Sequence, residues 1–218
     1  MHIPDGILPT GVLVGGYAVT GAATWLSLRK INQQENPQAG VPKAALLTAA
    51  FFVASWIHIP LPPTSVHLVL NGLLGVALGY YAFPAILIGL FLQAIMFQHG
   101  GLTTLGVNAA MMGIPALLAY GLFQLGLRLA PTDPANPRRR IVVGVAAFVA
   151  GALGLALAAF IAYMLLVTTI PATLDADVER AAITALTLAH LPLALIEGVF
   201  TVLVVEFLLR VKPELVAA

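Results

Sequence analysis

The first two residues, Met1 and His2, offer nitrogen atoms that can hold one metal ion. The α-amine of Met1, the deprotonated amide of His2 and a ring nitrogen of His2 can form two fused chelate rings in one plane. One position in that plane stays open, and a histidine from another part of the chain can fill it. Four nitrogens in a plane suit Ni(II) or Cu(II) and, less well, Co(II), whereas Zn(II) prefers a tetrahedron and Mg(II) or Ca(II) prefer oxygen.

The residues around this dipeptide fit a chelating role. A free α-amine has a pKa of about 7.7–8.0 and can give up its proton to a metal near neutral pH. No basic leader precedes the first apolar run, and His is a large second residue, so we expect Met1 to be retained. Pro4 stiffens the tail and Gly6 lets it turn back. Asp5 is expected either to cap the first helix or to accept a hydrogen bond from a ligand's second nitrogen.

The elements that must position these nitrogens are membrane helices. Of the 218 residues, 60% are hydrophobic and only 9% are charged, and the mean hydropathy is +0.99, whereas a soluble domain carries roughly a quarter charged residues. The absence of cysteine excludes disulfides, thiolate ligands and Cys nucleophiles. A net charge of +1 gives no reason to expect a nucleic-acid partner. We therefore expect an all-α integral membrane protein in contact with lipid.

Seven apolar segments separated by breaks rich in Pro, Gly and Asn predict about seven transmembrane helices. They are Leu8–Leu28, Ala44–Ile57, Ser65–Tyr81, Phe83–Phe97, Thr103–Leu129, Ile141–Ile170 and Ala181–Leu209. The second and fourth are short for independent spans and are expected to be tilted or packed inside the bundle. The chain is then a single membrane domain, 1–218, with a chelating tail over 1–7, a bundle over 8–209 and a cytoplasmic tail over 210–218.

The distribution of charge predicts the orientation of these helices. With the N-terminus outside and the C-terminus in the cytoplasm, nine of the 10 Lys and Arg residues fall on the cytoplasmic side, and only Arg180 is outside. All five histidines then fall at or near the outer side: His2, His58, His67, His99 and His190. His67 is expected about one turn into the third span. This arrangement predicts an outward-facing metal site.

Three stretches resemble one known family: "MHIPDGILP" at the start, "SVHLVLNGLLGVALG" over 65–79 and "LQAIMFQHGGLTTLGVNAAMMGIP" over 92–115. The chain is similar over essentially its whole length to the NikM/CbiM proteins, the nickel/cobalt substrate-binding (S) components of energy-coupling-factor ABC transporters. The resemblance implies a six-helix S-component core with an additional N-terminal helix, whose tail enters the bundle from outside. It also implies that the metal ligands are Met1, His2 and His67.

Further polar residues near the outer end are candidates for supporting or metal-entry roles. Asn71, expected one turn below His67 on the same face, would bond either a ligand nitrogen or another helix. His99 would be an entry residue or an ordinary loop histidine. Gln93 and Asn108 flank the "QHGG" turn and are expected to satisfy backbone groups of the outer loop.

The leading hypothesis is high-affinity capture of Ni2+, with Co2+ second, at the outer face of a prokaryotic plasma membrane. Pro4 and Asp5 resemble the nickel branch of the family more than the cobalt branch. The chain has no GxxxxGK[ST] phosphate loop, so energy must come from partners. The resemblance implies a transmembrane coupling (T) subunit, cytosolic ATPase subunits and a small accessory membrane subunit. Small residues on the first span form a candidate face for such a partner, or for another helix of this chain: Gly11, Gly15, Ala18 and Ala22.

Two alternatives come from other functional classes. An intramembrane metalloenzyme would need an open coordination position and a nearby general base, but the chain has no HExxH and no carboxylate beside any histidine. An ion-coupled metal carrier could use His190 and Glu197, seven residues apart on one helix face, as a proton relay. That carrier would work without ATPase partners. We therefore expect a transporter subunit and not an enzyme.

Overall fold

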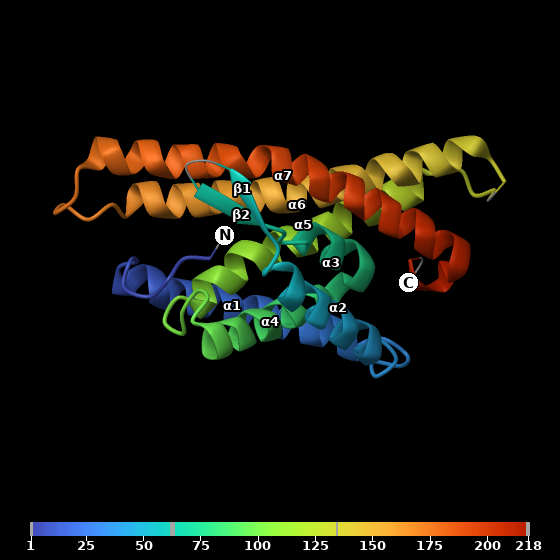
Figure 1. Ribbon diagram of the computed structural model, residues 1–218. Helices are drawn as coiled ribbons and strands as arrows, with labels where there is room; N and C mark the ends of the chain where they lie inside the picture. Colours follow the sequence, from blue (N-terminus) through green and yellow to red (C-terminus); the bar gives the residue numbers. More distant parts are fainter. Residues whose placement is uncertain (1, 62–63, 134, 217–218) are drawn as a thin grey trace.

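The computed structural model describes residues 2–61, 64–133 and 135–216. These residues contain seven α-helices and one small hairpin (Figure 1). The helices are α1 (Thr10–Asn32), α2 (Val41–Ala54), α3 (Asn71–Leu78), α4 (Ala82–Phe97), α5 (Leu105–Leu129), α6 (Pro137–Thr168) and α7 (Ala176–Val211). Two short 3-10 turns, η1 (Gly79–Tyr81) and η2 (Pro213–Leu215), follow α3 and α7. Strands β1 (His58–Leu61) and β2 (Thr64–His67) pair antiparallel.

Five segments of the described chain are long and apolar enough to cross a membrane: Thr10–Asn32, Asn71–Phe97, Leu105–Leu129, Pro137–Thr168 and Ala176–Val211. The helix α2 is apolar but shorter. The segment Asn71–Phe97 is not one straight helix, because Gly79 adopts a φ of 57° between α3 and α4. The Tyr81 hydroxyl donates to the carbonyl of Pro37 (2.6 Å), which places this break beside the α1–α2 connection.

The predicted third span, Ser65–Tyr81, is wrong in its first part. The helix begins only at Asn71, and Thr64–His67 forms β2, with His67 paired to His58 across the hairpin. Residues before proline favour extended backbone, and "HIPLPP" contains three prolines. Leu70 then adopts a left-handed φ of 55°, which a right-handed helix cannot contain. His67 therefore ends a strand, and Asn71 does not lie one helical turn below it.

The short helix α3 is the centre of the bundle. All eight of its residues are buried, and it packs mainly against α5 and α6. A Cβ on Gly75 would overlap the carbonyl oxygen of Ala116 in α5, and a Cβ on Gly72 would lie 2.7 Å from the carbonyl oxygen of Ala150 in α6. Small residues allow this close approach of helices. The backbone just before α3, which carries His67, is therefore attached to the most constrained helix of the fold.

The candidate partner face on α1 is not covered within the described part of the chain. All four of its small residues, Gly11, Gly15, Ala18 and Ala22, are exposed. A Cβ on Gly11 or Gly15 would meet no atom within 4 Å. The helix instead packs on α5 through a different side, where Gly106 lies against Tyr17. What contacts the small face stays a prediction.

Basic residues gather at one end of the bundle. They lie where α1, α5 and α7 end and where α2 and α6 begin: Arg29, Lys30, Lys43, Arg128, Arg138, Arg139, Arg140, Arg210 and Lys212. Arg180 lies near the start of α7, at the end of the molecule that carries the α6–α7 connection (Figure 1). The segregation of charge matches the sequence pattern, and the membrane side to which each end belongs stays a prediction.

We expect Gly75→Ala to destabilise the protein by about 1–3 kcal/mol, because the added methyl overpacks the α3–α5 contact. Thermal unfolding in detergent measures this loss. Gly121→Ala in α5 is the matched control, since a Cβ there meets no atom within 4 Å. Equal stability of the two variants would contradict the close approach of α3 and α5.

Candidate metal centre

The N-terminal segment, residues 2–9, folds back onto the start of α5. The Ile3 N–H donates to Asn108 Oδ1 (3.0 Å), and Asn108 Nδ2 donates to the Ile3 carbonyl (3.0 Å). The Thr104 hydroxyl donates to the same carbonyl (2.8 Å). Both backbone polar groups of Ile3 are thus satisfied by side chains at the N-terminal end of α5. Asn108 serves the backbone of this tail, where sequence reasoning expected it to serve the outer loop.

Asp5 fixes the tail a second time. Its Oδ1 accepts hydrogen bonds from the Thr103 hydroxyl (2.6 Å), the Thr103 N–H (3.0 Å) and the Thr104 N–H (3.2 Å). These bonds, the Thr103 hydroxyl first, lower the pKa of the Asp5 carboxyl below its ordinary value. Gly6 makes the following turn with a φ of 85°, and a Cβ on Gly101 would overlap the Asp5 carboxylate. Asp5 therefore bonds the two residues directly before α5 and does not cap α1.

Three imidazoles meet beside this tail: His2, His67 at the end of β2, and His99 in the loop after α4. One ligand nitrogen from each lies within 4.8 Å of the others. The His2 and His67 rings are stacked with centroids 5.1 Å apart, and His99 lies edge-on to His2 at 4.2 Å and to His67 at 5.4 Å. Segments far apart in the sequence thus bring three metal-ligating groups to one point.

The His2 side chain is in the state that a metal ligand requires. Burial, the largest cause, lowers the pKa of its imidazole well below the ordinary value, so the ring is neutral near pH 7. Both ring nitrogens are buried without a hydrogen-bond partner among the described residues. A buried polar atom left unpaired in a folded protein needs an explanation, and coordination of a metal ion is a role that suits the nitrogen of a neutral imidazole. Met1, the other predicted donor of this dipeptide, lies outside the described residues.

The remaining predicted residues have structural partners. Asn71 Nδ2 donates to the carbonyls of Gly154 (2.9 Å) and Met112 (3.2 Å), and so ties α3 to α6 and α5. Gln93 Nε2 donates to the Ser55 hydroxyl (2.8 Å), which joins α4 to the end of α2. Of the two roles expected for Asn71, bonding to another helix is the one observed. Gln93 bonds a side chain, where a backbone group was expected.

The proposed relay pair on α7 is not connected. His190 Nδ1 contacts the carbonyl of Leu186 in its own helix (2.8 Å). The Glu197 carboxylate accepts the N–H groups of Val69 (2.5 Å) and Leu70 (2.9 Å). Both residues are buried, but no hydrogen bond between them is present in the described part of the chain. The sequence placed Glu197 on the same helix face as His190 but did not indicate that its partners are backbone amides.

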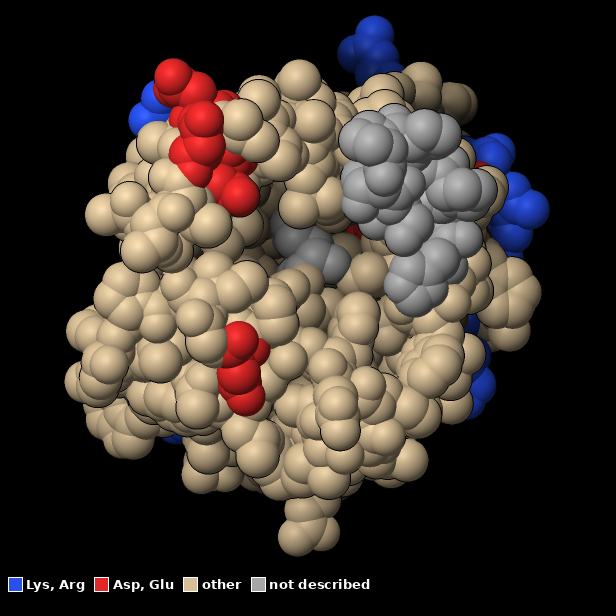
Figure 2. Space-filling model, turned by 60° about the vertical axis from the view of Figure 1, so that its left-hand side comes forward, with Lys and Arg blue, Asp and Glu red and all other residues tan. Residues whose placement is uncertain are grey.

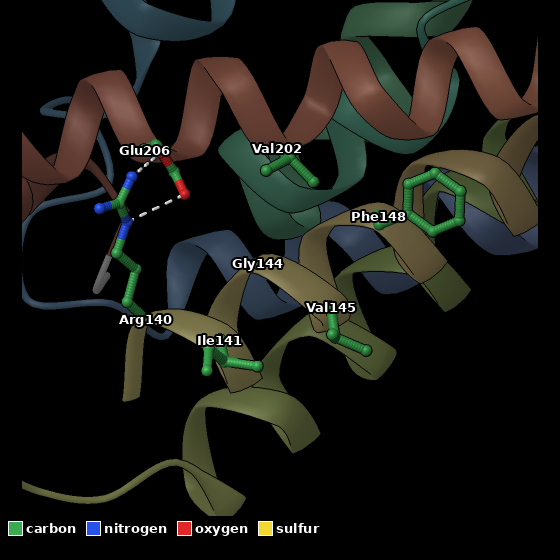
Figure 3. Close-up of a pocket in the computed structure, with 7 residues that line it drawn as sticks. All are labelled: Arg140, Ile141, Gly144, Val145, Phe148, Val202 and Glu206. Atoms are coloured by element: carbon green, nitrogen blue, oxygen red, sulfur yellow. Dashed lines mark hydrogen bonds and ion pairs between the residues drawn. The ribbon is translucent and has the colours of Figure 1, made fainter. Parts of the chain in front are cut away.

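The hollow between α6 and α7 differs from the histidine cluster in the side chains that line it. Figure 2 shows the end of the molecule near the N-terminal segment, with acidic side chains in two places and basic side chains mainly at the margins. A hollow of about 440 Å³ between α6 and α7 lies near the basic end and is lined by Arg140 and Glu206 with apolar neighbours (Figure 3). Arg140 pairs with Glu206 at 2.7 Å, so this hollow has no donor set for a cation. Within the described residues, the histidine cluster is the candidate metal centre.

Comparison with known proteins shows the family to which the chain belongs. A family model described as "Cobalt uptake substrate-specific transmembrane region", CbiM, matches residues 2–215. The chain belongs to the CbiM family. Relatives of this family member include nickel proteins as well, so CbiM/NikM is the fuller description. It is a transmembrane component of cobalt or nickel uptake and a multi-pass membrane protein.

Individual relatives and solved structures support this assignment. A putative metal transport protein of Haemophilus influenzae is 36% identical over 98% of this chain and 96% of its own length. The fused nickel transport protein NikMN of Rhodobacter capsulatus is 33% identical over the whole chain, which spans 64% of that protein. A crystal structure of a transition metal transporter superposes with a TM-score of 0.76 at 26% identity, covering 98% of this chain and 94% of the other. These relatives are transport proteins, which fits a non-enzymatic transporter component.

We expect Asn108→Ala to release the tail, because Ile3 loses two hydrogen bonds worth about 0.5–1.5 kcal/mol each. Amide hydrogen exchange at Ile3 should then be roughly 10- to 100-fold faster, as measured by mass spectrometry of N-terminal peptides. Asn32→Ala, an exposed position at the far end of α1, is the control and should leave that exchange unchanged. Unchanged exchange in Asn108→Ala would show that other contacts hold the tail.

Proposed function

We propose that the chain captures Ni2+, with Co2+ second, in a planar site of four nitrogens. The ligands are the α-amine of Met1, the amide and ring nitrogens of His2, and His67. The observation that carries the proposal is the stacking of the His2 and His67 rings, 5.1 Å apart between centroids, at the end of a tail fastened by α5. A ligand nitrogen of His67 lies within 4.8 Å of one of His2, which supports the proposal that His67 completes a chelate begun by His2.

The bonds to Ile3 support the chelate by fixing its register. Because the Ile3 N–H is engaged by Asn108, the amide available for metal binding is that of His2, directly before it. A terminal chelator in a frayed tail would lose affinity through the entropy of ordering it. Here the tail is already ordered in the folded protein by its hydrogen bonds to Asn108 and Thr104 and by those of Asp5, so metal binding does not have to order it.

A planar set of four nitrogens favours Ni(II), which explains our preference for nickel over cobalt. The printed descriptions of relatives include both a nickel transport protein and cobalt transport proteins, so family membership supports either metal. His99, edge-on to both stacked rings, supports the proposal as a third imidazole at the mouth of the site. We assign it the entry role, in which it receives the hydrated ion and passes it to His2 and His67.

We further propose that this chain is the S component of an energy-coupling-factor importer in a prokaryotic plasma membrane. Energy then comes from cytosolic ATPase subunits through a transmembrane T subunit, with a small accessory membrane subunit. The uncovered small-residue face of α1 is available to such a partner. Nine basic residues at the opposite end from His2 support a cytoplasmic location for that end by the positive-inside rule, and in this proposal the metal centre faces outward. Release inside requires His67 to separate from the tail.

The test is the metal content of purified protein after incubation with Ni2+, measured by mass spectrometry. We expect one Ni2+ per chain in the parent. A chain with one alanine added before Met1 should bind none, because the α-amine moves out of the chelate, and His67→Ala should also lose the ion. A chain with one alanine added after Ala218 is the matched control. If the N-terminally extended chain held as much Ni2+ as the parent, the terminal chelate would be refuted.

A further inference from the structure

Glu197 lies near the middle of α7 with 1% of its surface exposed, and its carboxylate contacts the segment that carries His67. Oε1 accepts the N–H of Val69 (2.5 Å) and Oε2 accepts the N–H of Leu70 (2.9 Å). None of the ion pairs in the described part of the chain involves Glu197. Its partners are therefore backbone amides, and both oxygens of the carboxylate are used as acceptors.

These two amides need a partner because they lie between elements. The strand β2 ends at His67 and α3 begins at Asn71, so residues 68–70 belong to neither. Amides at the start of a helix have no acceptor within that helix, and Val69 and Leu70 are buried. A forked carboxylate can satisfy both at once, whereas an amide side chain offers one oxygen only.

The same peptide unit also contacts the imidazole of His67. The Nδ1 of His67 lies 3.0 Å from the carbonyl oxygen of Leu68. A carbonyl can only accept, so Nδ1 carries the proton in this bond and Nε2 carries the lone pair. The peptide unit that joins Leu68 to Val69 thus receives a hydrogen bond from His67 at its oxygen and donates one to Glu197 at its nitrogen.

We propose that Glu197 is a positioning residue for His67, acting through the Leu68–Val69 peptide unit. Metal-ligating histidines commonly donate their second ring N–H to a carboxylate or a carbonyl, which fixes the tautomer and makes the ring a better donor to the metal. Here a carboxylate and a carbonyl act in series. By accepting the Val69 N–H, Glu197 polarises the peptide unit, since hydrogen bonds in a chain strengthen one another, and the Leu68 carbonyl becomes a stronger acceptor for Nδ1–H.

This relay also couples α7 to the metal centre. Glu197 belongs to α7, and the two amides that it holds, those of Val69 and Leu70, lie two and three residues after His67 and directly before α3. Glu197 thus links α7 to the backbone beside His67. The inference rests on the proposed function, because it requires His67 to be a ligand.

The test compares Glu197→Gln with the parent chain, using Ni2+ as the probe. The glutamine keeps the shape of the side chain but presents an NH2 group to one of the two amides. We expect Ni2+ affinity, measured by competition with a chelator, to fall about 10- to 100-fold. The visible absorption band of the bound Ni2+ should move to longer wavelength, because His67 becomes a weaker ligand. A purely structural role for Glu197 would change thermal unfolding without moving this band.

Glu206→Gln is the matched control, since it makes the same chemical change on the same helix at the Arg140 ion pair. It should leave both affinity and band unchanged. If Glu197→Gln had the parent's affinity and band, the relay would be overturned. His67→Ala separates the ligand role of His67 from the positioning role of Glu197. If His67→Ala loses Ni2+ while Glu197→Gln is unaffected, the relay alone is overturned. If His67→Ala retains Ni2+ fully, the ligand set itself is overturned.

Two further measurements apply if Glu197→Gln does not fold. Glu197→Asp keeps the charge and withdraws the carboxylate by one methylene, so its loss of affinity should be smaller but in the same direction. In the metal-free parent chain, 15N NMR of labelled histidines reports which ring nitrogen carries the proton, with His67→Ala assigning the signal. The relay predicts the Nδ1–H tautomer for His67, and an Nε2–H tautomer would contradict it.

Discussion

The structure depends on one constraint, that backbone polar groups buried inside an apolar bundle must find partners within the protein. Helices meet this constraint by themselves, but two stretches near the metal centre are not helical. The backbone of Ile3 is satisfied by Asn108 and Thr104, and the amides of Val69 and Leu70 are satisfied by Glu197. Each stretch carries one of the two stacked histidines. The side chains that bond these buried backbone groups are therefore also the ones that position the candidate ligands.

This arrangement explains how a chain with so few polar residues builds a rigid site. The end of α4, the start of α5, the end of β2 and the N-terminal tail meet near the start of the short, buried helix α3. Because α3 is packed against α5 and α6 at glycine contacts, the segment before it has little freedom to move. Rigid helices thus hold a centre made from irregular segments, and the close approach of His2, His67 and His99 follows from that geometry.

Much of the fold follows from the sequence because apolar length and turn chemistry are strong signals. The bounds expected for α5, Thr103–Leu129, differ from those observed by two residues at one end. The error at Ser65–Tyr81 has a physical cause: apolar residues in a strand and in a buried helix can have the same composition, and the left-handed backbone at Leu70 leaves no mark in a run of Val and Leu. The histidines of the site were easier to predict than the residues that hold their backbone in place. Glu197 and Asn108 act on backbone groups, which have no residue-specific pattern in the sequence.

In the proposed site, the metal lies in a plane of four nitrogens to which the N-terminal dipeptide and His67 both contribute. X-ray absorption at the nickel edge of the Ni2+-loaded protein tests this geometry, because the spectrum reports the number, type and geometry of the ligands together. We expect four nitrogen ligands at closely similar distances with the edge features of a square-planar ion. An octahedral shell rich in oxygen, or a tetrahedral one, would contradict it.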